Sequence, residues 1–218
     1  MHKECFPKNG WKVLHGLKDM LVKRGAILAG GTALSLHIGH RLSVDLDFFT
    51  NKDFKVEPVI SEIRKAGRNF SVISEGEGHI TANIDGTKFS LSKYEYPFLE
   101  KPAVYKGIQV AGIFDIASMN IFAVSQRGTK RDFVDLFFIL QDIPFHKLAE
   151  HMVKRFGKER INPVHVGKSL VYFSDAESNP EPEYLKGKEV KWEKVKTFFK
   201  RHVRQFVFDL DAAVKENL

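Results

Sequence analysis

The stretch that decides the fold reads Gly30-Gly31-Thr32-Ala33-Leu34 and, after a spacer, Val44-Asp45-Leu46-Asp47-Phe48-Phe49. The short apolar run 26–29 precedes it and predicts a buried strand. Residues 32–38 are typical of a short helix, and 43–49 alternate strictly between apolar and polar residues, which predicts a second strand. The sequence therefore predicts a strand, a glycine turn, a helix and then an acidic strand.

The acidic strand carries two carboxylates with one apolar residue between them. Because strand side chains alternate between faces, Val44, Leu46 and Phe48 are expected in the core. Asp45 and Asp47 are then side by side on the other face, about 7 Å apart at Cα. Such a pair must be solvated, protonated or bound to a metal. Its hard oxygen ligands suit Mg²⁺ (or Mn²⁺) carried with a nucleoside triphosphate.

The glycine pair suits a phosphate group. Gly30 and Gly31 let backbone N–H groups approach phosphate oxygens, and a helix N-terminus favours anions. Thr32 either caps the helix or reaches a phosphate oxygen. The alternative for the whole unit is a tight strand-to-helix turn beside a solvated acidic edge.

These motifs resemble a known family. The stretch 30–49 is similar to the signature of the AbiEii/AbiGii toxin family of nucleotidyltransferases, in the DNA polymerase β-like superfamily. The stretches 115–119 and 126–136 resemble its helical motif, which ends in Asp-x-x-Asp-Leu, and 94–99 is also similar. The resemblance covers roughly residues 25 to 142.

The resemblance implies a fold and a reaction. The fold is α/β (α+β), a minimal nucleotidyltransferase fold with a short mixed sheet flanked by helices, followed by a C-terminal helical domain. The reaction is metal-assisted nucleotidyl transfer from an NTP to an acceptor hydroxyl, with tRNA or another RNA as the acceptor. The implied role is the toxin of a bacterial toxin–antitoxin or phage-defence pair, with a cognate antitoxin as partner.

Two positions depart from the family pattern. The third metal-binding carboxylate of the superfamily is replaced by Ser90, and a family lysine that contacts the triphosphate is replaced by Asn120. Lys130, Arg131 or the basic C-terminal helix could supply the missing positive charge. These departures keep open a non-catalytic nucleotide- or RNA-binding module. A nucleotidyltransferase of small molecules is a further alternative, which the basic C-terminal helix disfavours.

Other polar residues have two interpretations each. Asp132 and Asp135 share a helix face, either as carboxylates that approach the metal or ribose, or as a solvated face with Asp132 paired to Arg131 or Arg127. His37 and His40 have a zinc-like spacing, but no third ligand follows. We expect His40 and Arg41 to orient the acidic strand or touch phosphate.

Positive charge is concentrated near the C-terminus. The chain has 218 residues and a net charge of +7. Residues 186–204 carry eight basic and two acidic side chains, beside an apolar stripe of helical spacing. They form either a solvated helix face or a track for an RNA or DNA backbone. The proposed RNA-binding residues are Lys194, Lys196, Lys200 and Arg201.

The remaining pattern sets the organisation and excludes several classes. An α/β part, 1–112, is followed by a helical part, 113–218. Further helices are expected at 11–21 and 56–66, and further strands at 70–73, 79–84, 88–92 and 108–111. A single cysteine, Cys5, rules out an internal disulfide. With no P-loop, hydrolase triad, signal peptide or long apolar run, we expect a cytoplasmic protein without membrane segments.

Overall fold

The computed structural model describes residues 1–6 and 8–216. These form two compact units, Met1–Gly112 and Ile113–Leu218, which are considered separately below. Among the described residues, no helix combines the length and the apolar character needed to cross a membrane.

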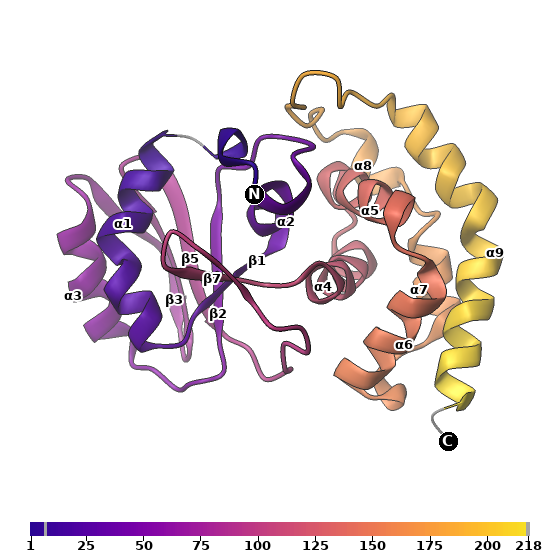
Figure 1. Cartoon of the computed structure of the whole chain (residues 1–218), viewed down its shortest axis with the longest axis horizontal. Coiled ribbons are helices and arrows are strands. Elements are labelled where there is room, and N and C mark those ends of the chain that lie inside the picture. The colour runs from indigo at the N-terminus through magenta and orange to yellow at the C-terminus, as the bar shows by residue number, and fades with distance from the viewer. Residues whose placement is uncertain (7, 217–218) are drawn as a thin grey trace. The chain divides into compact units, whose positions relative to one another are not determined.

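The first unit is built on a mixed sheet (Figure 1). Within the described residues the sheet has seven strands in the order β3-β4-β5-β2-β1-β7-β6. The β1–β7 and β2–β5 pairs are parallel, and the other neighbours are antiparallel. The elements are η1 (Lys3–Cys5), α1 (Lys8–Lys23), β1 (Ile27–Ala29), α2 (Gly30–Ile38), β2 (Leu46–Thr50), α3 (Val56–Ala66), β3 (Phe70–Gly76), β4 (His79–Ile84), β5 (Thr87–Lys93), β6 (Ala103–Tyr105) and β7 (Ile108–Val110).

One face of this sheet is apolar and lies under α1 and α3, which pack on each other and on the sheet (Figure 1). The alternation expected for β2 is present, with Leu46 and Phe48 fully buried and Asp47 half-buried. Fully buried side chains of β4 and β5 complete this core, namely Ile80, Ala82, Ile84, Phe89 and Leu91. The opposite face carries Asp47 together with Ser90, its neighbour on β5.

Two sequence expectations for the first unit were wrong in detail. The acidic strand begins at Leu46, so Asp45 lies outside it and Val44 is 50% exposed instead of being in the core. The edge strand β6 was not predicted; it has three residues, and Val104 is 72% exposed. A short strand at a sheet edge buries too little to leave an alternating pattern.

The regular elements in the described part of the second unit are helices. The helices pack mainly in the pairs α6–α9, α4–α5, α7–α9 and α4–α6. Their bounds are α4 (Ile113–Gln126), α5 (Lys130–Asp142), α6 (Phe145–Phe156), η2 (Lys158–Arg160), α7 (Pro163–Ser169), α8 (Ser174–Glu177) and α9 (Trp192–Glu216).

Aromatic rings form the centre of the second unit. Phe133 on α5 is fully buried, and its ring centroid lies 5.0 Å from that of Phe173 and 5.5 Å from that of Phe199. A second contact stacks Phe145 on Phe206, with centroids 4.2 Å apart. Large rings without polar atoms fill such a core with little need for hydrogen bonds, and the chain has 19 phenylalanines.

A buried polar cluster joins α4 to α6. Asp115 is fully buried, and one of its carboxylate oxygens lies 3.0 Å from His151 Nε2. The Arg155 guanidinium donates to the Asp115 carbonyl at 2.6 Å and to the Ser118 hydroxyl at 2.7 Å. His151 and Arg155 are four residues apart and thus share one face of α6. This cluster has a structural role in holding the two helices together.

The hairpin between β4 and β5 turns at Asp85-Gly86, a dipeptide typical of two-residue hairpin turns. Asp85 and Gly86 both have positive φ, 49° and 82°, as a two-residue type I′ turn requires. The Asp85 carboxylate accepts hydrogen bonds from the backbone N–H groups of Arg68 and Asn69, at 3.1 and 2.8 Å. These hydrogen bonds lower the pKa of Asp85 from its ordinary value.

This lowered pKa predicts a pH-dependent contribution to stability. A carboxyl group whose pKa falls on folding stabilises the protein above its unfolded-state pKa, and the contribution is lost as the pH falls through the folded-state value. Asp85→Asn tolerates the positive φ but removes the charge. We expect the variant to be less stable than the wild type at pH 7, with the difference shrinking below about pH 4. Urea unfolding at a series of pH values measures this, and an unchanged difference at pH 2.5 would contradict it.

Candidate active site

The glycine turn brings backbone close to an acidic side chain. Gly30 opens α2 with φ of 69°, a left-handed conformation that residues with a Cβ adopt at a cost of about 1–2 kcal/mol. A Cβ placed on Gly30 would lie 3.6 Å from Asp47 Oδ2, so the two residues are neighbours. Gly31 lies in the first turn of α2, where backbone N–H groups lack intrahelical acceptors. The N-terminus of α2 therefore lies beside the Asp47 carboxylate.

The strand register places Ser90 beside Asp47. In the sheet, Asp47 on β2 pairs with Ala29 on β1 and with Ser90 on β5. The Ser90 hydroxyl donates to Asp47 Oδ1 at 2.7 Å. The two carboxylate oxygens thus have different surroundings, because Oδ1 accepts from Ser90 and Oδ2 is near the glycine turn. The sequence analysis placed Ser90 at the third ligand position beside the acidic pair, but it did not predict that the hydroxyl would donate a hydrogen bond to Asp47.

Thr32 acts on the backbone that carries Asp45. The residue at the N-cap of α2 is Ala29, and no side chain caps the helix. The interpretation of Thr32 as the helix cap was therefore wrong. Its hydroxyl contacts the Asp45 carbonyl oxygen and lies 2.8 Å from the Ser43 hydroxyl. A carbonyl oxygen only accepts, so Thr32 donates to Asp45 and accepts from Ser43. Its single hydroxyl proton is then not available for a phosphate oxygen.

The N-terminal segment supports the same loop. The backbone N–H of Ser43 donates to the Cys5 carbonyl at 3.0 Å, and the Cys5 thiol donates to the Ser35 carbonyl at 3.1 Å. Burial raises the pKa of Cys5 to about 11, so the thiol is neutral at pH 7 and retains its proton for this bond. Hydrogen bonds therefore run from Cys5 through Ser43 and Thr32 to the backbone of Asp45. Ser43 and Cys5 were not among the residues that the sequence assigned to the site.

These contacts predict the effect of removing the Thr32 hydroxyl. Thr32→Val keeps the shape of the side chain but leaves the Asp45 carbonyl and the Ser43 hydroxyl without this partner. We expect a loss of about 1–3 kcal/mol in the free energy of unfolding, together with reduced nucleotidyl transfer. Thr32→Ser retains the hydroxyl and is the matched control, expected to keep more of both properties. Urea unfolding and initial rates test this; equal losses in the two variants would contradict it.

The remaining candidates in the first unit are held by backbone groups. The His37 ring Nε2 lies 2.8 Å from the Ala111 carbonyl oxygen, so this nitrogen carries a proton and is not available to ligate a metal. Arg41 is 4% exposed, and one of its guanidinium nitrogens donates to the Leu42 carbonyl at 3.0 Å. Throughout the described residues, no three His, Cys, Asp or Glu side chains form a metal-binding group.

In the second unit, Asp132 pairs with an arginine and helps to cap a helix. Its carboxylate accepts from Arg127 Nε at 3.1 Å and from NH2 at 3.0 Å, and it forms a capping box with Thr129 at the start of α5. The pairing with Arg127 is confirmed, but the expectation of a solvated face was wrong, because Asp132 is only 6% exposed. Asp135 also lies on α5 and is 3% exposed. Asn120 lies on α4 and is 8% exposed.

Lys130 anchors a loop of its own unit. Its ammonium group lies 2.9 Å from Glu181 Oε1, and its backbone N–H donates to the Asn179 side chain at 3.0 Å. The side chain is only 7% exposed, and its nitrogen lies 5.5 Å from the centre of the Trp192 ring. Lys130 thus stabilises the 179–181 loop, whereas the neighbouring Arg131 is exposed.

The four basic residues assigned to α9 differ in their surroundings. Lys196 pairs with Glu177 at 2.8 Å and with Glu193 at 2.7 Å, and these carboxylates raise its pKa. Lys194, Lys200 and Arg201 are exposed. The Lys200 ammonium lies 5.9 Å from the centre of the Phe173 ring. Three of the four assigned residues therefore contribute exposed positive charge to α9.

The chain is similar to known proteins in sequence and in fold. The family model described as "Nucleotidyl transferase AbiEii toxin, Type IV TA system" matches residues 13–110, which include Asp45, Asp47 and Ser90. A protein of Aquifex aeolicus (strain VF5), described as uncharacterized, is 40% identical over 185 residues, 83% of this chain and 87% of the relative.

Two solved structures share the fold over nearly the whole chain. JHP933 from Helicobacter pylori has a TM-score of 0.53 and 17% identity, covering 99% of this chain and 97% of the other. MenT4, a nucleotidyltransferase toxin from Mycobacterium tuberculosis H37Rv, has a TM-score of 0.54 and 15% identity, covering 96% and 94%. The fold is that of the nucleotidyltransferases. This chain belongs to the AbiEii nucleotidyltransferase toxin family and is a nucleotidyltransferase.

Proposed function

We propose that the chain transfers a nucleotide from an NTP to a hydroxyl group of RNA, using Mg²⁺ or Mn²⁺ held by Asp45 and Asp47. The observation that carries this proposal is the short distance between the start of α2 at Gly30 and Asp47 Oδ2. A phosphate on the backbone N–H groups of that turn would lie next to the carboxylate. In this proposal the turn binds the anion and the Asp47 side chain binds the cation, and the two lie side by side.

The donor set fits a metal that is shared with the substrate. Mg²⁺ is commonly bound by one or two carboxylates together with substrate phosphates, so a third protein carboxylate is not required. Asp45 and Asp47 would hold it, and Ser90 would keep the Asp47 carboxylate oriented. Bound there, the metal would neutralise charge on the phosphates.

The chain's own residues would position the reactants. The N-terminus of α2 would bind the β- and γ-phosphates, and Thr32 would keep Asp45 in place through its carbonyl. The acceptor hydroxyl oxygen would attack the α-phosphorus and lose its proton, while the bond from that phosphorus to the leaving oxygen breaks and releases pyrophosphate. Positioning and charge neutralisation account for most of such catalysis.

The first test removes the carboxylates singly. We expect Asp45→Asn and Asp47→Asn to lower transfer of label from an NTP to total tRNA by about 10²-fold or more. Without metal, both variants should be as stable as the wild type or more stable, because a like-charge repulsion is relieved. Added Mg²⁺ should raise the melting temperature of the wild type more than that of either variant.

The matched control is Asp19→Asn, an exposed carboxylate on α1, which should leave all three measurements unchanged. Wild-type activity in either active-site variant would contradict the proposal. If the wild type transfers no label from any NTP but still binds RNA, the alternative of a non-catalytic binding module, suggested by Ser90, would replace it.

The second test concerns the RNA acceptor. Reversing Lys194, Lys200 and Arg201 to Glu should weaken tRNA binding without changing NTP affinity. Because up to three fewer counterions would be released, the log–log salt slope should become shallower by about 2–3. Lys147→Glu with Lys154→Glu, at exposed sites on α6, is the control. Unchanged tRNA affinity in the α9 variant would mean that this surface is only solvated.

The family membership also implies a cognate antitoxin. We propose that the chain acts as the toxin of such a pair. Inhibition of bacterial growth by the wild type, and its loss in Asp47→Asn, would support this role.

A further inference from the structure

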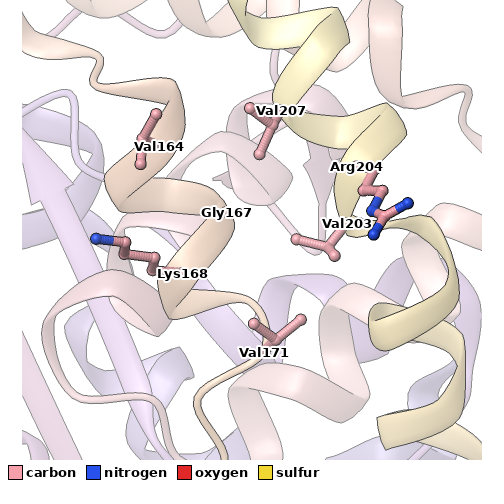
Figure 2. Close-up of a pocket in the computed structure, with 7 residues that line it drawn as sticks. All are labelled: Val164, Gly167, Lys168, Val171, Val203, Arg204 and Val207. Atoms are coloured by element: carbon pink, nitrogen blue, oxygen red, sulfur yellow. The ribbon is translucent and has the colours of Figure 1, made fainter.

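An apolar groove lies within the second unit, between α7 and α9 (Figure 2). Its volume is about 360 Å³, within the range of ligand-binding pockets. Four valines point into it, two from each side of the groove. The lining residues are Val164, Gly167, Lys168, Val171, Val203, Arg204 and Val207.

Gly167 sets the depth of this groove. A Cβ on this residue would overlap Val207 Cγ2, so the backbone of α7 approaches α9 closely at this point. On the other side of this contact the valine side chains are not covered by the described chain. Val164 is 57% exposed, and Val171, Val203 and Val207 are half-buried. Packing within the unit therefore leaves an apolar surface open.

The charged side chains that line the groove have one sign. Lys168 and Arg204 are both exposed, and they extend to opposite sides of the valines in Figure 2. The lining contains no acidic side chain. An occupant with apolar groups in its middle and carboxylates at its edges would complement both properties of this surface.

We propose that this groove, named here the valine groove, binds an acidic amphipathic helix of a partner protein. Aliphatic side chains spaced along one face of that helix would lie between the four valines, and its Asp or Glu residues would pair with Lys168 and Arg204. A groove between two helices suits this mode of recognition, in which residues at i, i+3, i+4 and i+7 insert.

Other occupants match the surface less well. A nucleic-acid backbone needs hydrogen-bond donors along its length, which valines do not provide. A second copy of this chain brings a net charge of +7 to a groove that is already positive. The proposal is independent of the nucleotidyl-transfer reaction, because none of the lining residues belongs to the candidate active site.

The test uses a labelled synthetic helix of about five turns, with leucines on one face and glutamates elsewhere. A second peptide carries lysine in place of every glutamate. Fluorescence anisotropy with the full chain should show binding of the acidic peptide about tenfold tighter, or more, than of the basic one. The double substitution Lys168→Glu with Arg204→Glu should weaken binding of the acidic peptide by about tenfold or more. Circular dichroism verifies that the variants fold.

Two matched controls separate the groove from general attraction to a basic protein. The reversal Lys147→Glu with Lys154→Glu changes the net charge equally but lies outside the groove. Val164→Asp should weaken binding of the acidic peptide. Val104→Asp, at another exposed valine of the chain, should leave that binding unchanged. Equal binding of both peptides, or equal losses in groove and control variants, would overturn the proposal. So would a loss of self-association or of tRNA binding, in place of peptide binding, in the groove variants.

Discussion

The candidate site depends on the pairing register of β2 between β1 and β5. Leu46 and Phe48 must face the core, so Asp47 faces the other side of the sheet. The same register puts Ala29, which precedes the glycine turn, on one side of Asp47 and Ser90 on the other. A shift by one residue would bury the carboxylate and expose the phenylalanine. The burial of two apolar side chains thus determines where the acidic group meets the N-terminus of α2.

Hydrogen bonds to the backbone give the rest of this site its shape. Thr32, Ser43 and Cys5 do not bring charge to the site, yet together they connect the N-terminal segment to the loop that carries Asp45. Each of these polar groups is largely buried and has a partner inside the unit. Such an arrangement fixes the backbone that carries Asp45.

In the second unit, some charged side chains form ion pairs within the unit, and others are exposed to solvent. Lys130, Asp132 and Lys196 form ion pairs that hold helices and a loop together. Lys194, Lys200 and Arg201 are exposed and are the residues proposed above to contact RNA. Net charge and residue spacing treat all of these residues alike, because neither contains information about which partner lies next to each side chain.

The amino-acid sequence by itself determined the local structure and the chemical type of the site. Alternation and helical spacing predicted most strands and helices, Asp85-Gly86 predicted its hairpin, and 30–49 identified the family. The tertiary structure alone decided that β2 starts at Leu46, that Ser90 binds Asp47, and that Lys130 is paired. These contacts join residues 43 and 51 positions apart in the last two cases. Periodicity reports only neighbours within a few residues, whereas the choice of a distant partner depends on how the whole unit packs.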